Sequence, residues 1–278
     1  MWTDGFGALR ATLHTMKAFS PGTPSTMAPI GHTSGMAAPL PEFLGLGTQK
    51  GGTTTLHRLL EQHPDVYLPA CKEVHFFDQN HDAGEGWYRG HFTNAEPHQT
   101  CGEITPFYLF HPDVPGRIHN LLPKARLVVL LRDPVERTIS QLFHARKRGF
   151  ETLEPFDALA AEAERLQSCD PVSLQKHSYL SRSRYLEQLD RYEALFPREQ
   201  LLILRSEDLF STPELVWQQL LSFLALQPID WPGTLLRANA GDGLGDQIDP
   251  ALRHQLRQQL AETVAGVRSR YGIEWEWS

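Results

Sequence analysis

Short apolar runs alternate with amphipathic stretches along most of this chain. The runs at residues 42–47, 126–131 and 201–204 are almost uninterrupted in apolar character, which is typical of strands buried on both faces of a parallel sheet. A fourth, shorter run at 66–68 predicts another strand. These four runs lie far apart in the chain, so other elements must connect them.

Helical spacing fills the intervals between these runs. Leu56, Leu59 and Leu60, followed by Pro64, predict a helix that begins near Thr53 and ends before the proline. Asp133 is expected to cap a second helix, with a proline in its first turn, that extends to about residue 147. Apolar positions three and four residues apart predict four more helices, over about 156–167, 183–196, 213–224 and 250–268.

Strands that alternate with helices predict an α/β fold, with a central parallel sheet and helices on both faces. Such sheets bind ligands at the carboxyl ends of their strands. Residues 1–40 differ from the rest, because they are rich in Pro, Gly, Ser, Thr and Met without a hydrophobic period. We expect a disordered or loosely attached tail there and one ordered domain over 41–278. Asp4 and the missing apolar block argue against a secretory signal.

Composition narrows the classes of partner. The 278 residues carry a net charge of -7, so no general polyanion-binding surface and no nucleic-acid partner are expected. No apolar stretch reaches the ~18 residues that span a bilayer, and we expect a soluble, cytoplasmic protein without a membrane anchor. The three cysteines lack CxxC spacing, and the 13 histidines contain no HExxH. We therefore expect neither a disulfide framework nor a metal site.

Residues 47–54 (GTQKGGTT) carry the clearest candidate chemistry. They join a predicted strand to a predicted helix, where glycines let backbone N–H groups approach an anion and the helix terminus adds positive charge. Lys50 adds a full charge. The segment departs from the nucleotide-triphosphate loop GxxxxGK[ST], because Thr53 stands at the lysine position, and Lys50 replaces the third glycine of GxGxxG. It predicts a phosphate-bearing ligand other than ATP; a plain glycine-rich turn is the alternative.

Taken in order, the motifs resemble those of sulfotransferases that use 3′-phosphoadenosine-5′-phosphosulfate (PAPS). GTQKGGTTTL is similar to their 5′-phosphosulfate loop, and RDPVERTIS at 132–140 is similar to their 3′-phosphate motif. Between them, KEVHFFD (72–78), GWY (86–88) and GEITP (102–106) resemble the heparan sulfate and bacterial carbohydrate-type branch. The similarity is looser beyond residue 150, and beyond about residue 230 only the terminal segment from Tyr271 to Trp277 is similar. The resemblance implies a P-loop-like sulfotransferase fold, PAPS as co-substrate, 3′,5′-ADP as product and no metal.

Sulfuryl transfer needs a cation at the leaving phosphate oxygen and a base at the acceptor, by analogy with phosphoryl transfer. The resemblance places the catalytic lysine at Lys50. It places the catalytic glutamate at Glu73, with His75 as the rival base. The expected ligands of PAPS are Lys50, Gly51, Gly52, Thr53 and Thr54 at the 5′-phosphosulfate, and Arg132 and Ser140 at the 3′-phosphate.

Simpler roles stay open for some of these residues. Glu73 is also explained as the ion-pair partner of a neighbouring lysine, and His75 as a buried core histidine. Arg137, inside the 3′-phosphate motif, is expected to be an exposed or ion-paired helix residue. Phe76 and Phe77 are expected in the core.

Two departures from the heparan sulfate branch bear on the acceptor. Ile104 stands where several of those enzymes have a lysine that contacts the acidic polysaccharide, and an acidic segment at 239–246 replaces a lysine-bearing late loop. Together with the negative net charge, they favour a small or weakly charged acceptor, a carbohydrate or a small metabolite, over a highly sulfated polymer. A P-loop nucleotide kinase and a non-catalytic nucleotide-binding homologue are the alternative functions.

Overall fold

The computed structural model describes residues 38–167, 170–233 and 248–277, which belong to one compact unit. The tail expected over 1–40 falls almost entirely outside the described residues, and the acidic segment at 239–246 falls wholly outside them. Within the described ranges, no helix is both long enough and apolar enough to cross a membrane.

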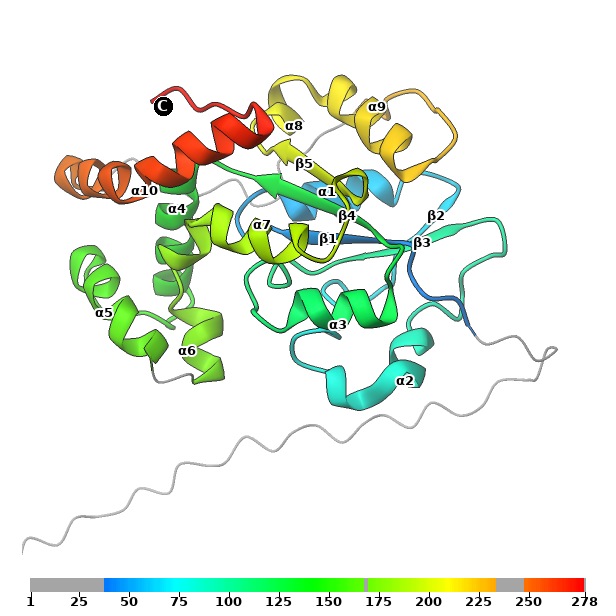
Figure 1. Cartoon of the computed structure of the whole chain (residues 1–278), viewed down its shortest axis with the longest axis horizontal. Coiled ribbons are helices and arrows are strands. Elements are labelled where there is room, and N and C mark those ends of the chain that lie inside the picture. Colours follow the sequence, from blue (N-terminus) through cyan, green and yellow to red (C-terminus); the bar gives the residue numbers. More distant parts are fainter. Residues whose placement is uncertain (1–37, 168–169, 234–247, 278) are drawn as a thin grey trace, which may run out of the picture. The chain divides into compact units, whose positions relative to one another are not determined.

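Five parallel strands form the central sheet, in the order β2-β3-β1-β4-β5 (Figure 1). The strands are β1 (Phe43–Gly47), β2 (Val66–Tyr67), β3 (Thr100–Ile104), β4 (Arg126–Leu131) and β5 (Leu201–Arg205). The predicted parallel sheet is confirmed, although β3 was not expected. After β1 the chain builds β2 and β3 on one side and then returns to add β4 on the other. The crevice at the carboxyl ends of β1 and β4 is therefore a topological switch point, where such sheets bind ligands.

Ten helices occur among the described residues, together with short 3-10 turns at His81–Ala83, Ser181–Ser183 and Arg198–Gln200. The helices are α1 (Thr53–Leu60), α2 (Gly84–Gly90), α3 (Val114–Leu121), α4 (Pro134–Lys147), α5 (Pro155–Gln167), α6 (Pro171–Lys176), α7 (Tyr185–Glu193), α8 (Asp208–Ser211), α9 (Pro213–Leu224) and α10 (Pro250–Tyr271). All six predicted helices are present within a few residues of their expected ends. The sequence pattern missed α2, α3, α6 and α8.

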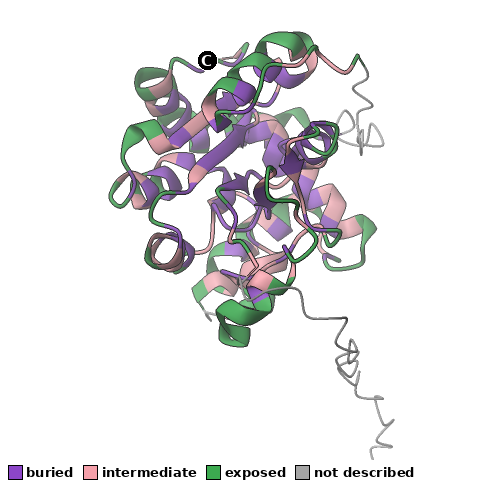
Figure 2. Cartoon of the chain, turned by 90° about the vertical axis from the view of Figure 1, so that its right-hand side faces the viewer, coloured by how far each residue is buried: buried purple, intermediate pink, exposed green. Residues whose placement is uncertain are grey.

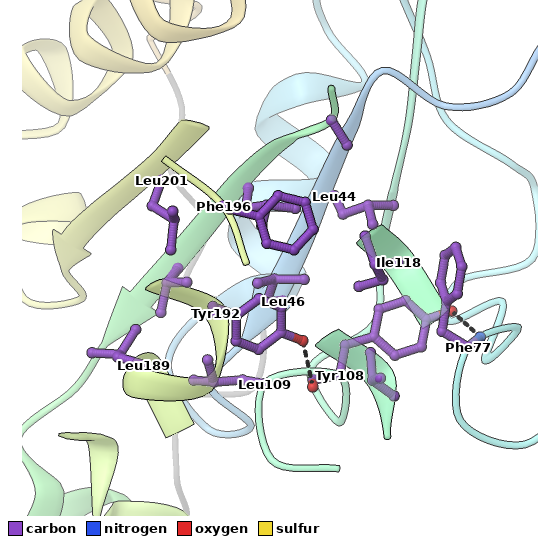
Figure 3. Packing of buried hydrophobic residues seen from close by; sticks show 14 of the residues in the cluster. Leu44, Leu46, Phe77, Tyr108, Leu109, Ile118, Leu189, Tyr192, Phe196 and Leu201 are labelled. Carbon is purple, nitrogen blue, oxygen red and sulfur yellow. Dashed lines mark hydrogen bonds between the residues drawn. The ribbon is translucent and has the colours of Figure 1, made fainter. Parts of the chain in front are cut away.

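Alternate residues of β4 enter two separate hydrophobic clusters, one on each face of the sheet. Leu127, Val129 and Leu131 pack with residues of α3, α7 and α10, whereas Val128 and Leu130 pack with residues of α1 and α9. Figure 3 shows the first cluster, and Figure 2 shows the strands buried beneath the helices. Helices on both faces of the sheet are thus confirmed.

Two local features direct the chain into the helices at the switch point. Asp133 accepts hydrogen bonds at Oδ1 from the backbone N–H groups of Val135 (2.8 Å) and Glu136 (3.1 Å), which caps α4 as expected. Gly52 has a φ of 90° at the start of α1, in the left-handed region that glycine adopts without steric strain. Both helix N-termini therefore begin at the carboxyl edge of the sheet.

Candidate active site

A cleft of about 1240 Å³ opens at the carboxyl ends of the central strands. Its walls come mainly from the β1–α1 loop, the segment around Glu73, the beginning of α4, the β5–α8 connection and the C-terminal segment. All the expected site residues line it except Gly51 and His75; those on its wall are Lys50, Gly52, Thr53, Thr54, Glu73, Arg132 and Ser140. The fold thus brings the expected residues of three separate segments, 50–54, 73 and 132–140, to one place.

The β1–α1 loop is fixed against β4. Thr48 donates from N and from Oγ1 to the carbonyl oxygen of Leu130, over 2.8 and 2.9 Å. Gly51 donates its N–H to the carbonyl oxygen of Thr48 (2.9 Å), and a Cβ on Gly51 would lie 2.5 Å from Thr48 Oγ1. Gly51 therefore shapes the loop instead of presenting its N–H to the cleft. The first N–H groups of α1 have no partner within their own helix and remain the natural anion donors.

Arg132 extends from the end of β4 to this loop. Its Nη1 donates to the carbonyl oxygen of Lys50 (3.2 Å), and its own carbonyl oxygen accepts from the Tyr185 hydroxyl (2.7 Å). Ser140 lies on the cleft wall two helical turns after the cap, as the spacing predicted. His144, one turn further, also lines the cleft, and burial together with the charge of Lys50 lowers its pKa.

Glu73, His75 and Asp78 form a chain of ionisable groups on the 72–78 segment. Glu73 Oε1 lies 3.4 Å from Lys72 Nζ, and Glu73 Oε2 lies 3.3 Å from His75 Nε2. His75 Nδ1 lies 2.7 Å from Oδ2 of Asp78, whose side chain is fully buried. Only Glu73 of the three lines the cleft. Asp78 was not among the expected site residues.

These contacts set the protonation states. Burial alone would lower the pKa of His75, but hydrogen bonds to Asp78 and Glu73 raise it to about 9, so the imidazole carries a proton at neutral pH. Burial would raise the pKa of Glu73, but His75 and Lys72 outweigh it and lower that pKa. Glu73 is therefore the group of this pair that can accept a proton. Among the described residues, no three His, Cys, Asp or Glu side chains are grouped to hold a metal ion.

A buried hydroxyl and carboxyl network supports this segment. Glu103 accepts hydrogen bonds from Tyr88 (2.7 Å), Tyr108 (2.9 Å) and Thr105 Oγ1 (2.9 Å). Thr105 Oγ1 in turn accepts from the backbone N–H of His75 over 3.4 Å. Burial raises the pKa of Glu103 to about 7. The glutamate of the GEITP motif thus holds the 72–78 segment from below and stays out of the cleft.

The neighbouring Ile104 also points away from the cleft. It is 2% exposed and packs with β1, since a Cβ on Gly45 would lie only 2.8 Å from its Cγ1. Phe76 and Phe77 are buried as expected. A side chain at position 104 therefore has no access to an acceptor in this structure.

Arg182 is a buried residue behind the cleft wall that the sequence did not reveal. It is 4% exposed, donates from Nη1 to Gln49 Oε1 (2.6 Å), and lies 4.5 Å from the ring centroid of Phe107. Its Nη2 donates to the carbonyl oxygens of Leu174 and Gln175 near the end of α6. Arg182 thus ties the β1–α1 loop to α6. A single arginine between helices carries no periodic signal, so only the three-dimensional contacts disclose it.

The β5–α8 connection and the C-terminal segment were also missed as cleft walls. They contribute Arg205, Glu207, Arg257, Trp275 and Trp277, among others. Of these, Arg205 and Glu207 lie where the sequence resemblance is looser, and Trp277 lies at its terminal end, but none was named as a site residue. The others are isolated residues in the sequence, brought to the cleft by long-range packing.

Arg137 corrects an expectation. It was expected to be exposed or ion-paired, but it is 0% exposed and hydrogen-bonded to neutral groups: Ser183 Oγ (2.5 Å), Gln141 Oε1 and the carbonyl oxygen of Tyr179. Burial lowers its pKa to about 10. The 179–183 segment covers this side of α4, which helical spacing within α4 could not indicate.

Comparison with known proteins shows the family to which this chain belongs. The signature of the family described as "Sulfotransferase domain" matches residues 40–230. The membrane-associated sulfotransferase kil1 of Dictyostelium discoideum is 29% identical, over 78% of this chain and 62% of its own. Human heparan sulfate glucosamine 3-O-sulfotransferase 5 is 31% identical, over 68% of this chain and 54% of its own. The chain thus spans between about half and two thirds of the length of these relatives.

Solved structures agree with the fold. The crystal structure of a sulfotransferase from Alicyclobacillus acidocaldarius matches 85% of this chain and 98% of its own, with a TM-score of 0.72 and 27% identity. Mouse sulfotransferase SULT7A1 complexed with PAP matches 81% of this chain and 84% of its own, with a TM-score of 0.55 and 12% identity, and supports the fold alone. The expected P-loop-like sulfotransferase fold is confirmed.

Proposed function

Because the chain belongs to the sulfotransferase domain family, we propose that it is a sulfotransferase that moves a sulfuryl group from PAPS to a hydroxyl or amine acceptor. One observation carries the proposal: the Lys50 loop and Arg132 line the same cleft and are joined by a hydrogen bond. A donor with phosphate groups at both its 5′ and 3′ positions needs such a pair of cationic elements.

The donor end follows from the loop and the two helix N-termini. The first N–H groups of α1, with the hydroxyls of Thr53 and Thr54, would hold the 5′-phosphosulfate. Arg132 and Ser140 would hold the 3′-phosphate, the arginine through a bidentate fork. During transfer the sulfur–oxygen bond to the 5′-phosphate breaks and 3′,5′-ADP leaves. Lys50 would stabilise the charge that develops on the leaving phosphate oxygen.

The acceptor end is assigned to Glu73. As the acceptor oxygen or nitrogen forms its bond to sulfur, its proton would pass to the Glu73 carboxylate. The protonated His75 would hold that carboxylate from behind, and the buried Asp78 would fix the imidazole. His75, the rival base, already carries a proton at neutral pH and is assigned the role of positioning Glu73.

The acceptor is proposed to be a small or weakly charged carbohydrate or metabolite. The net charge of -7 supports this proposal, whereas Ile104 is buried away from the cleft and does not bear on it. The curated relatives include enzymes named for heparan sulfate glucosamine and one named as membrane-associated. Assays should therefore include glycan as well as small-molecule acceptors, and cell fractionation should test the proposed cytoplasmic location.

Two other functions make different predictions. A P-loop nucleotide kinase would consume ATP with magnesium, but Thr53 occupies the position of the kinase lysine. A non-catalytic homologue would bind the nucleotide without transferring a group. The ionised Glu73 on the cleft wall favours the catalytic function over this one.

Titration calorimetry with 3′,5′-ADP, AMP and ATP, followed by a PAPS-dependent transfer assay on an acceptor panel, separates these functions. We expect 3′,5′-ADP to bind most tightly and the Arg132→Gln variant to lose about tenfold or more of that affinity. The same variant should bind AMP almost unchanged, because AMP lacks the 3′-phosphate. Tighter binding of ATP than of 3′,5′-ADP would contradict the proposal. Tight 3′,5′-ADP binding without turnover would favour the non-catalytic homologue.

A further inference from the structure

Two carboxylates adjoin the proposed 3′-phosphate position. Asp133 directly follows Arg132 and is 8% exposed. Glu207, at the end of the β5–α8 connection, accepts a hydrogen bond at Oε1 from the backbone N–H of Asp133 (2.9 Å). Both residues line the cleft. A carboxylate next to an arginine competes with a phosphate for the guanidinium and repels the incoming anion.

The remaining oxygens of these carboxylates are bound by the C-terminal segment. Asp133 Oδ1 caps α4, and Asp133 Oδ2 accepts a hydrogen bond from Trp277 Nε1. Glu207 Oε2 accepts from Trp275 Nε1 over 3.1 Å. Each of the four carboxylate oxygens thus has an N–H donor. In this arrangement neither carboxylate forms an ion pair with Arg132 within the described part of the chain.

The two indoles are themselves held in place. Gly272, with a φ of 66°, ends α10 and lets the chain turn back. Arg205 Nη1 then donates to the carbonyl oxygen of Glu274 (2.8 Å), and Trp275 is 5% exposed. The Arg257 guanidinium lies 5.6 Å from the ring centroid of Trp277. The C-terminal segment is therefore a packed part of the cleft wall.

We propose that Trp275 and Trp277 are positioning residues that give the cleft its preference for a 3′-phosphorylated nucleotide, by holding the Glu207 and Asp133 carboxylates away from Arg132. This inference rests on the proposed function. The charge of Arg132 already acts on Asp133: burial raises the pKa of this carboxyl, while the Trp277 hydrogen bond and the charges of Arg132 and Arg257 oppose that rise. Without the indole N–H, the freed Oδ2 would be available to the guanidinium of Arg132, whose charge already acts on this carboxyl.

A rescue experiment tests this mechanism. Trp277→Phe keeps an aromatic ring but removes the pyrrole half of the indole together with its N–H donor. We expect the affinity for 3′,5′-ADP to fall about tenfold and the affinity for AMP to stay unchanged, measured by calorimetry. Adding Asp133→Asn removes the competing charge, and asparagine still caps a helix. The double variant should therefore recover most of the lost affinity, which a merely structural role of Trp277 would not produce.

Further variants complete the test. Trp275→Phe, with Glu207→Gln as its rescue, repeats the rescue experiment on the second carboxylate. This pair of variants replaces the first if Trp277→Phe does not fold. Trp231→Phe, whose indole packs on Trp217 and does not line the cleft, is the matched control. An unchanged ratio of 3′,5′-ADP to AMP affinity in the Phe variants, or failure of the rescue, overturns this inference alone. Absence of 3′,5′-ADP binding by the unmodified protein overturns the proposed function and this inference with it.

Discussion

Arg132 donates from Nη1 to the carbonyl oxygen of Lys50 across 3.2 Å, although 82 residues separate them in the sequence. The contact exists because β1 and β4 are parallel neighbours in the sheet, so the segments that follow them leave the sheet at the same edge. It holds the side chain of one proposed donor-binding residue against the backbone of the other. The two ends of the proposed PAPS site are thus positioned as one unit.

Replacing Lys50 with alanine should reduce sulfuryl transfer by about 100- to 1000-fold, because a preorganised donor to the leaving oxygen is lost. Lys50 has a φ of 70°, and alanine meets the same backbone constraint, so the thermal midpoint should change little. The turnover number on an active acceptor is the measurement. Lys124→Ala, at an exposed position after α3, is the control. Turnover close to that of the control would reject the role of Lys50.

Glu73→Gln should lower the turnover number by about 100- to 10,000-fold, because the amide cannot accept the acceptor's proton. Binding of 3′,5′-ADP should stay almost unchanged, since Glu73 is assigned to the acceptor. Single-turnover rates and calorimetry on the same preparation separate the two effects. Glu85→Gln, an exposed carboxylate on α2, provides the comparison. Parallel loss of nucleotide affinity would instead assign Glu73 to the donor site.

His75→Gln should shift the acidic limb of the rate profile to higher pH. His75 lowers the pKa of Glu73 through a hydrogen bond and through its charge, and glutamine removes the charge. The profile of kcat/KM against pH is the measurement. An acidic limb at the same pH in both proteins would show that His75 does not tune Glu73.

The same substitution should change how stability depends on pH. The pKa of His75 is raised to about 9 in the folded protein, so its stabilisation is fully present below the ordinary histidine value and is lost as pH rises through about 9. The free energy of unfolding of the unmodified protein should therefore fall towards that of His75→Gln between pH 6.5 and 9. Urea unfolding at the two ends of this range measures the difference.

Glu103→Gln should produce a second pH effect at lower pH. Burial raises the pKa of Glu103 to about 7, so its protonated form stabilises the fold fully below the ordinary glutamate value, and this contribution is lost as pH rises through about 7. Relative to the glutamine variant, the unmodified protein should lose stability over that interval. Urea unfolding at pH values below and above it measures the change, with Glu85→Gln as the reference. A constant difference between Glu103→Gln and the unmodified protein would show that Glu103 does not titrate as proposed.

The elements that could be predicted from the sequence are those with a local pattern. β4 is a continuous apolar run buried on both faces, and α4 carries its cap and first-turn proline in sequence. β3 has no such pattern, because its Gly102 is required by a distant contact: a Cβ there would lie 2.1 Å from the ring of Phe43. That requirement comes from the neighbouring strand and leaves no periodic trace in β3 itself.

The residues of the candidate site also divide into those that a local sequence pattern predicts and those that only distant contacts determine. Lys50, Arg132 and Ser140 lie on segments whose position relative to a strand end follows from the chain order, so their meeting could be expected. Trp275 reaches the cleft, and Arg182 reaches the cleft residue Gln49, through packing between segments that are far apart in sequence. Arg137 was misjudged for the same reason, since its partners come from a different segment. Helical spacing predicts which face a residue shares but not what covers that face.

The adjacency of β1 and β4 also constrains how the molecule folds. The pair carries the hydrogen bond from Thr48 to Leu130, two residues 82 positions apart, so the central pairing requires closure of a long chain loop before its contacts form. Topologies dominated by such non-local pairings reach the native state slowly. A ribosome must release β4 before the central strand β1 acquires its second neighbour, so β1 keeps one unpaired edge in a nascent chain that ends before β4.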